Sequence, residues 1–331
     1  MSYIHQLGER RVIEIMMRHL DLMPNMPVPF WDDVSAVDLG GDRLGVLKTD
    51  MLVWSTDIPP GMTHYQAARK AVVMNISDLG AKGVRTAAIL ISFGLPRDLR
   101  EEEVVELAKG MNAGAREYGT YILGGDTNET DEIVISGMAF GIGEKKRLML
   151  RSGARPGDIL ATTGAFGKTA AGFKILLEGL DAPVDLKRCL VDTVFMPRAR
   201  VEEGVALAES GAVTACMDSS DGLALSLYDL SRSSGVGFRV DHLPAAPEAQ
   251  QFAEMHDLEL SELVFYGGEE YELVFTVDPG RIEDAKQALE QVGGELIEIG
   301  EVTKETTITY KRGDRLEPIK AGGWEHFKSS P

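Results

Sequence analysis

The sequence predicts an α+β fold in two domains. The chain has 331 residues, which is more than one hydrophobic core usually holds. Helical and strand patterns mix along it without a strict βαβ alternation, which favours α+β over a doubly wound sheet. A charged and polar stretch at residues 144–155, followed by the turn Pro156-Gly157-Asp158, divides the chain near its middle. We therefore expect an N-terminal domain at residues 1–150 and a C-terminal domain at residues 151–331.

In the N-terminal half, apolar residues at helical spacing predict helices, and short apolar runs bounded by Gly or Pro predict strands. The expected helices cover residues 7–20, 64–82 and 101–118. The expected strands cover residues 45–49, 87–93, 121–123 and 133–142. Pro24, Pro27 and Pro29 predict an extended connection after the first helix.

The same patterns continue after the break. We expect strands at residues 159–163, 213–217, 271–277 and 296–301. We expect helices at residues 168–178, 198–209, 223–233 and 282–292. The sequence shows no internal repeat of solenoid length and no low-complexity segment, so a compact enzyme-like domain pair is favoured over a repeat protein.

Net charge and cysteine content limit the kinds of partner and the cellular compartment that we expect. The formal net charge of -18 disfavours nucleic acid and anionic membrane surfaces as partners. Cys189 and Cys216 lie among apolar neighbours and outside any CxxC pattern, which predicts free thiols and a reducing compartment. Residues 1–20 lack a signal-peptide core, and no apolar run approaches membrane-spanning length. We expect a cytoplasmic protein.

Several aspartates stand next to Gly, Ser or Thr at predicted ends of helices and strands. Apart from Asp78, which lies within a helix, they are Asp32, Asp33, Asp50, Asp126, Asp218 and Asp221. Any one of them can serve as a helix cap or turn residue. Asp78 is harder to explain in this way, because a buried carboxylate without a partner costs several kcal/mol. It shares a helix face with Asn75, three residues earlier.

Together these carboxylates point to a hard divalent cation. Magnesium binds carboxylate oxygens, keeps some of its water and bridges to phosphates. Phosphoryl transfer depends mainly on positioning and on cations beside the developing charge. None of the six histidines pairs with another at zinc-ligand spacing. The residues alone therefore predict a two-domain enzyme that handles metal and phosphate.

Two glycine-containing segments have open interpretations. Residues 164–169 (GAFGKT) end like a Walker A loop, but Thr162 stands where that motif requires glycine, so we reject a P-loop. The segment is either a tight strand-to-helix turn or a backbone site for an anion. Residues 267–273 (GGEEYEL) form either a solvated acidic turn or an acidic loop for a cationic substrate.

Nine segments, in this order, resemble the thiamine-monophosphate kinase family, part of the superfamily that includes aminoimidazole ribonucleotide synthetase. They are DDVSAV at 32, KTDMLV at 48, NISDLGAKG at 75, GGDT at 124, RSGARPGD at 151, TTGAFGKTAAG at 162, PRAR at 197, MDSSDGL at 217 and GGEEYELVFT at 267. The resemblance extends from about Asp32 to Phe327. The last segment is the one that indicates the thiamine-phosphate branch.

The resemblance implies direct transfer of the γ-phosphoryl group of ATP to thiamine monophosphate, giving thiamine diphosphate. It implies several Mg²⁺ ions and no catalytic side chain beyond positioning. Matching magnesium positions are Asp33, Thr49, Asp50, Asp78, Asp126, Asp218 and Asp221. Matching ATP positions are Gly125, Asp126, Arg151 and Ser220, and matching substrate positions are Asp57, Glu269 and Trp324. An aromatic face and carboxylates both attract a flat cation such as thiazolium.

The sequence departs from the family pattern at three places. Trp31 replaces a glycine before the paired aspartates, Asp57 replaces a histidine that meets the substrate, and GGEEYEL replaces GGEDYEL. Residues 57–62 are predicted to form a loop near the substrate. The resemblance further implies a homodimer whose N-terminal domains pair their sheets, with the site in a cleft between domains.

Two alternatives stay open. The first is another ATP-dependent enzyme of the superfamily. Its hydrogenase-maturation branch has a C-terminal cysteine, where this sequence has KSSP, and its selenophosphate branch has an early cysteine, whereas none precedes Cys189 here. A synthetase that acts on a ribonucleotide remains as the alternative within the superfamily. The second alternative is a protein that binds ATP without turnover, which the complete set of aspartates disfavours.

Overall fold

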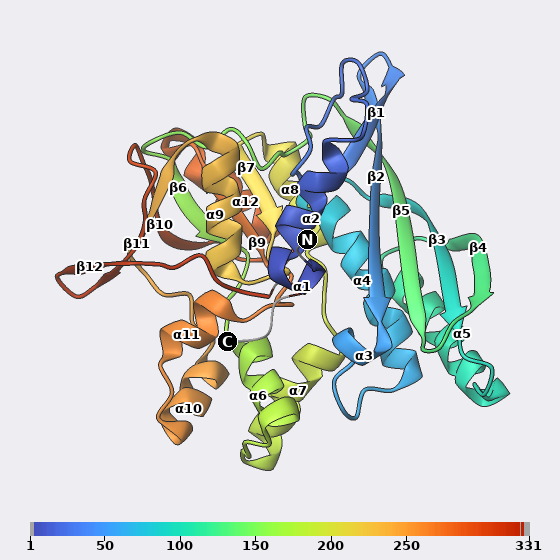
Figure 1. Cartoon of the computed structure of the whole chain (residues 1–331). Helices are drawn as coiled ribbons and strands as arrows, with labels where there is room; N and C mark the ends of the chain where they lie inside the picture. The colour runs from blue at the N-terminus through green and yellow to red at the C-terminus, as the bar shows by residue number, and fades with distance from the viewer. Residues whose placement is uncertain (1–2, 325, 328–331) are drawn as a thin grey trace.

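The computed structural model describes residues 3–324 and 326–327 and contains two mixed β-sheets with helices packed on them (Figure 1). The predicted α+β class with two domains is confirmed. Among the described residues, no helix combines the length and the apolar character needed to cross a membrane.

The N-terminal sheet has five strands in the order β1-β2-β5-β3-β4, and all neighbours are antiparallel except β3 and β4. The strands are β1 (Ser35–Gly40), β2 (Arg43–Val53), β3 (Thr86–Leu95), β4 (Ile122–Glu129) and β5 (Val134–Glu144). The helices of this half are α1 (Ile4–Leu7), α2 (Glu9–Met17), α3 (Trp54–Asp57), α4 (His64–Ala81) and α5 (Glu101–Glu117). Helices α4 and α5 cover one face, called here the inner face.

The C-terminal sheet has seven strands in the order β12-β11-β8-β10-β6-β9-β7. The strands are β6 (Ile159–Thr162), β7 (Val213–Asp218), β8 (Gly237–Val240), β9 (Leu273–Val277), β10 (Ile297–Thr303), β11 (Ile308–Arg312) and β12 (Arg315–Pro318). The helices are α6 (Lys168–Glu178), α7 (Val184–Phe195), α8 (Val201–Ser210), α9 (Leu223–Ser234), α10 (Pro247–His256), α11 (Leu260–Tyr266) and α12 (Ile282–Gln291), with a 3₁₀ turn at Pro279–Arg281. Helices α6, α7, α10 and α11 group beside this sheet, at the bottom of Figure 1.

Helix α4 is the central element of the molecule. Thr63 caps it by accepting a hydrogen bond from Gln66 N, and Thr63 N donates one to Gln66 Oε1, which completes a capping box. Most of its residues are buried, because it packs on the N-terminal sheet and on α8 of the other half. A Cβ on Gly204 would lie 1.9 Å from Gly80 O, so glycine there allows the close approach of α8 to α4.

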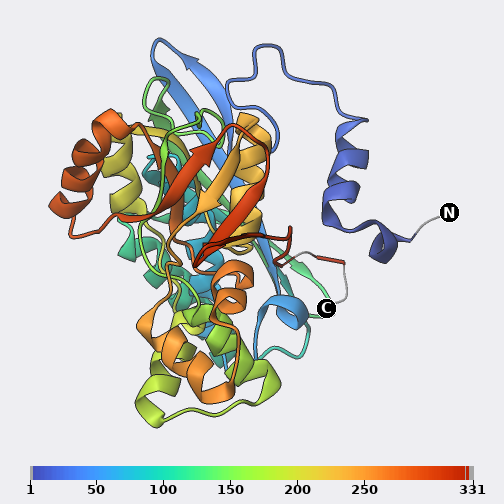
Figure 2. The ribbon, with the colours of Figure 1, turned by 90° about the vertical axis from the view of Figure 1, so that its left-hand side faces the viewer.

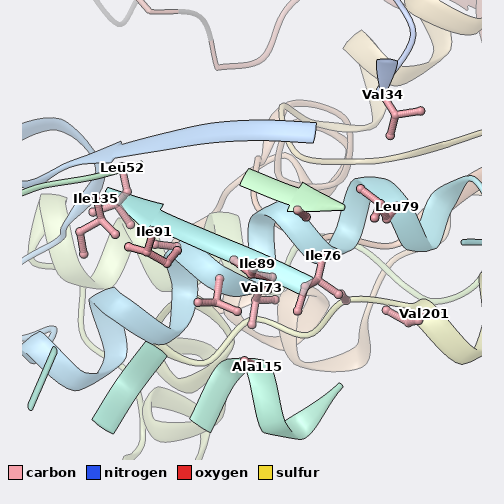
Figure 3. Close-up of a cluster of buried hydrophobic side chains, with 14 of the residues drawn as sticks. Val34, Leu52, Val73, Ile76, Leu79, Ile89, Ile91, Ala115, Ile135 and Val201 are labelled. Atoms are coloured by element: carbon pink, nitrogen blue, oxygen red, sulfur yellow. The ribbon is translucent and has the colours of Figure 1, made fainter. Parts of the chain in front are cut away.

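The N-terminal core forms between α4, the sheet and α5 (Figure 3). Its labelled members include Val73, Ile76 and Leu79 of α4, Ile89 and Ile91 of β3, and Ala115 of α5. Val201 of α8 joins the same cluster, so the two halves share apolar contacts. Burial of each large side chain stabilises the fold by roughly 2 kcal/mol, which fixes α4 and the polar residues it carries.

Helices α1 and α2 stand away from the remainder of the chain, joined to β1 by a long connection (Figure 2). The predicted single helix at residues 7–20 is wrong in extent, because Gly8 separates two shorter helices. An ion pair between Arg10 and Asp229 of α9, 2.8 Å long, attaches α2 to the C-terminal half.

Candidate metal and phosphate site

Three predicted metal ligands meet in one place. Oxygen atoms of Asp33, Asp78 and Asp218 all lie within 4.8 Å of one another, and all three residues are buried. Asp33 precedes β1, Asp78 lies in α4, and Asp218 ends β7. The cluster, called here the aspartate triad, therefore joins segments from both halves of the chain. Ser77 donates a 2.6 Å hydrogen bond to Asp218 Oδ2 and orients that carboxylate.

Two cationic side chains, Lys82 and Arg151, lie next to Asp33. Lys82 Nζ lies 2.8 Å from Asp32 Oδ1 and 2.6 Å from Asp33 Oδ2, and it donates to the Cys216 carbonyl at 2.7 Å. Lys82 therefore supplies a positive charge directly beside Asp33 Oδ2. Arg151 Nε donates to Asp33 Oδ1 at 2.6 Å.

The pKa values reflect this crowding. Burial, followed by the neighbouring carboxylate of Asp218, raises the pKa of Asp78 well above its ordinary value. Burial and then Asp33 raise the pKa of Asp218 to about 6. Burial would also raise the pKa of Asp33, but Arg151 and Lys82 hold it below its ordinary value. Lys48 lowers both the Asp78 and the Asp218 pKa, but burial and the neighbouring carboxylates outweigh it.

The triad fits magnesium by its chemistry. It offers carboxylate oxygens only, which are ligands of a hard divalent ion. Its oxygens are close enough to share one ion, and the raised pKa of Asp218 shows that an added positive charge would be favourable there.

Asp50 lies beside the triad but is not one of its members. The structure corrects its predicted place, because Asp50 lies inside β2 and not at a strand tip. Its side chain points to the inner face, where Lys48 Nζ is 3.2 Å from Asp50 and 3.1 Å from Asp78. Thr49 points to the opposite, outer face, where its hydroxyl donates to the Gly137 carbonyl at 2.7 Å.

Asp126 is farther away. It lies within β4, the exposed edge strand, and not after a strand tip as predicted. It pairs with Ser92 of β3, and its side chain lies on the outer face. Strand β4 is the third strand beyond β2 in the sheet, so the two strands are about 14 Å apart. Gly125 precedes it, where a Cβ would lie 1.5 Å from the Ile91 carbonyl oxygen, so no side chain fits. The structure does not bring Asp126 to the triad of the same chain.

The loop after β7 brings together three of the predicted nucleotide and substrate positions, Ser220, Glu269 and Trp324. Glu269 N donates to Ser220 O at 2.6 Å, and Trp324 N donates to Asp221 O at 3.1 Å. Glu269 and Trp324 are thus held on the segment that follows Asp218. Residues 218–222, called here the junction loop, connect the triad to both positions.

Asp221 reaches solvent on this loop, yet the protein packed around it raises its pKa to about 7, with Glu9 and Asp218 adding to the shift. The Asp221 carboxyl therefore holds its proton up to near-neutral pH unless a positive charge lies beside it.

Asp57 ends α3 and is tied to its own helix. Its Oδ2 accepts a 2.6 Å hydrogen bond from Val53 N, while its carbonyl accepts one from Lys70 Nζ at 3.0 Å. The same Lys70 nitrogen lies 2.6 Å from Glu269 Oε1. Lys70 thus bridges two predicted substrate positions, Asp57 and Glu269.

Arg151, a predicted ATP contact, is engaged inside the protein. Besides Asp33, it donates to Asp229 Oδ2 and to the Trp31 carbonyl, each at 3.1 Å. The Trp31 ring lies 5.0 Å below the Arg232 guanidinium, a cation–π contact. Arg151 fixes the position of Asp33, and a direct contact with ATP stays a prediction.

The segment at residues 164–169 does face an anion, and that anion is a side chain. Glu270 Oε1 accepts hydrogen bonds from Gly167 N at 2.6 Å and Thr169 N at 3.2 Å, at the start of α6. Burial raises the pKa of Glu270 to about 7. Glu272, in the same acidic segment, pairs with Arg200. Glu270 and Glu272 therefore bind groups of the protein itself, whereas Glu269 belongs to the site.

Sequence reasoning missed the three buried or half-buried lysines of the site, Lys48, Lys70 and Lys82. The signal was available for two of them. Lys70 and Lys82 stand in or next to the helix in which Asp78 was recognised as needing a partner, and the same argument applies to a buried ammonium group.

Comparisons with known proteins agree with this geometry. Residues 31–143 match AIR synthase related protein, N-terminal domain, and residues 155–311 match AIR synthase related protein, C-terminal domain. The chain is 38% identical to thiamine-monophosphate kinase of Nitrosopumilus maritimus over 98% of this chain and 99% of that protein. It is 36% identical to that of Pyrococcus horikoshii, over 90% of each.

A solved structure of AaThiL complexed with AMPPCP and TMP superposes with a TM-score of 0.86 at 26% identity, covering 98% of this chain and 99% of that one. The similarity to these relatives therefore extends over both halves of the chain. The chain belongs to the thiamine-monophosphate kinase family of AIR synthase-related proteins.

Proposed function

We propose that this protein transfers the γ-phosphoryl group of ATP to thiamine monophosphate and forms thiamine diphosphate and ADP. The observation that carries the proposal is the junction loop. It starts at Asp218 of the buried triad and holds Glu269 and Trp324 through backbone hydrogen bonds. A metal-binding cluster and an acidic and aromatic acceptor site thus share one short segment. The relatives of this chain carry the name of the same activity.

Asp33, Asp78 and Asp218 would hold magnesium, with Asp50 and Asp221 near enough to add charge. Bound magnesium would neutralise charge on the phosphates of ATP during transfer. The protein supplies position: Ser77 orients Asp218, and Arg151 fixes Asp33. A phosphate oxygen of the acceptor is already a nucleophile at neutral pH, so no general base is needed.

Glu269, Trp324 and Asp57 would receive the acceptor. Its thiazolium ring is a flat cation, attracted by a carboxylate and by an aromatic face. Trp324 is 47% exposed and therefore available to a ligand. Ser220, Gly125 and Asp126 remain proposed contacts of ATP. We also propose the domain boundary near residue 150 and a cytoplasmic location, in keeping with two free thiols.

A homodimer is also part of the proposal. The outer face of the N-terminal sheet exposes apolar side chains at Val37, Leu39, Met51, Leu90 and Ile142. An apolar face of this kind marks an interaction surface. In a dimer built on it, Asp126 would face the partner subunit. Light scattering should give twice the mass of the chain, and Met51→Asp should give a monomer; a monomeric parent would exclude the dimer.

The activity test uses purified protein with ATP, thiamine monophosphate and MgCl₂. We expect equal amounts of thiamine diphosphate and ADP, measured by chromatography. Omitting Mg²⁺ or adding EDTA in excess should stop the reaction. Folded protein that forms neither product would refute the proposal. ADP release with a ribonucleotide acceptor but not with thiamine monophosphate would instead favour a synthetase.

A further inference from the structure

Lys70 is a buried cation outside the triad. It lies on α4, and only 1% of its side chain is exposed. Its ammonium donates to Glu269 Oε1 at 2.6 Å and to the Asp57 carbonyl at 3.0 Å. Glu269 belongs to the C-terminal half and Asp57 to the N-terminal half, so Lys70 connects the two halves at the acceptor site.

This arrangement leaves one carboxylate oxygen free. Glu269 Oε1 is held by Lys70, whereas Glu269 Oε2 is buried and has no hydrogen-bond partner among the described residues. A buried hydrogen-bond acceptor without a donor is destabilising. Such an atom is explained when a ligand supplies the donor.

The backbone around Glu269 is also constrained. Glu269 and Tyr271 have φ values of 64° and 53°, a region that side-chain-bearing residues rarely adopt. The strain is held by hydrogen bonds from Glu269 N to Ser220 O and from Tyr271 N to Ser219 O. Strain of this kind persists where the surrounding structure fixes a functional group. The junction loop therefore fixes the backbone of Glu269, and Lys70 fixes its carboxylate.

We propose that Lys70 is a positioning residue for acceptor recognition. It fixes one oxygen of Glu269 so that the other, Oε2, receives an N–H donor from an amino group of the cationic substrate, since the quaternary ring nitrogen carries no hydrogen. It also ties the Asp57 segment to the same carboxylate. The inference rests on the proposed function, because it takes Glu269 as an acceptor contact.

The test is Lys70→Met, which keeps much of the apolar stem and removes the ammonium. We expect KM for thiamine monophosphate to rise about tenfold or more, while KM for ATP stays within about twofold. A role limited to folding would instead change both constants or the amount of folded enzyme. Lys286→Met is the matched control: it removes a paired lysine of α12, on the surface, and should change neither constant.

A double-mutant cycle separates action through Glu269 from an independent effect. Because Lys70 acts through that carboxylate, Lys70→Met/Glu269→Gln should have the same KM for the acceptor as Glu269→Gln alone. Additive losses would overturn the proposal, as would an acceptor KM for Lys70→Met within twofold of the parent. If Lys70→Met does not fold, Lys70→Gln is judged by the same criteria.

Crystal structures test the role of Lys70 independently of the proposed activity. Crystal structures of the parent and of Lys70→Met should show the Glu269 carboxylate in one rotamer in the parent and displaced in the variant. An unchanged carboxylate would refute the role of Lys70 even in an active enzyme. Absence of thiamine monophosphate turnover in the parent would refute the proposed function while leaving this comparison valid.

Discussion

Asp218→Asn is expected to lower kcat by more than about a hundredfold, without loss of the fold. Losing a residue that only supports a metal ligand typically costs 10- to 100-fold, and Asp218 is a member of the triad itself. The amide has nearly the shape of the carboxylate but lacks the charge that a divalent cation requires. Because burial raises the pKa of Asp218, the folded protein without metal should tolerate the neutral side chain.

The measurement is steady-state turnover of ATP and thiamine monophosphate, combined with the rise in melting temperature on adding MgCl₂. Both should be lost together if Asp218 binds the metal. Asp185→Asn is a suitable control, because its carboxylate is on the surface of α7, where it pairs with Arg188. Activity of Asp218→Asn within about threefold of the parent would contradict the metal assignment.

The aspartates illustrate what sequence can and cannot predict. Sequence context drew attention to Asp33 and Asp218, which a cap or turn could also explain, and to Asp78, which lies inside an apolar helix; the family resemblance then marked all three as metal positions. Their convergence depends on α4 lying between the two halves, which no local pattern encodes. Asp126 has a comparable context between Gly and Thr, yet its pairing with Ser92 places it on the outer face, and the strand order places it on the edge strand. Strand order is a tertiary property, so sequence alone could not separate it from the others.

The missed elements have local explanations. Helix α7 was not predicted, although Leu186, Leu190 and Val194 are buried at helical spacing and provided a signal. Strands β8 and β12 contain four residues each, too few for a periodic pattern to stand out. Strand β8 is determined by its pairing with β10, which is distant in sequence, whereas β12 forms a hairpin with the neighbouring β11. Strand β7, which ends at Asp218, was predicted, because its apolar run is longer.

Lys82→Met is expected to produce the largest loss of stability. The Lys82 side chain is fully buried, and its ammonium compensates both Asp32 and Asp33 and bonds the Cys216 carbonyl. Removing one partner of a buried ion pair leaves an uncompensated charge and costs roughly 3–5 kcal/mol. We expect the melting temperature to fall by on the order of 10 °C. Lys187→Met, which breaks an exposed pair with Asp181, should cost less than about 1 kcal/mol.

Magnesium makes this experiment a test of the site as well as of the fold. In Lys82→Met, Asp33 keeps Arg151 but loses its second cation, so a divalent ion at the triad should stabilise the variant more than the parent. The rise in melting temperature with MgCl₂ should therefore be larger in the variant. An equal rise in both proteins would mean that Asp33 does not contact the ion. A melting temperature equal to that of the parent would show that Asp32 and Asp33 do not depend on Lys82 for charge compensation.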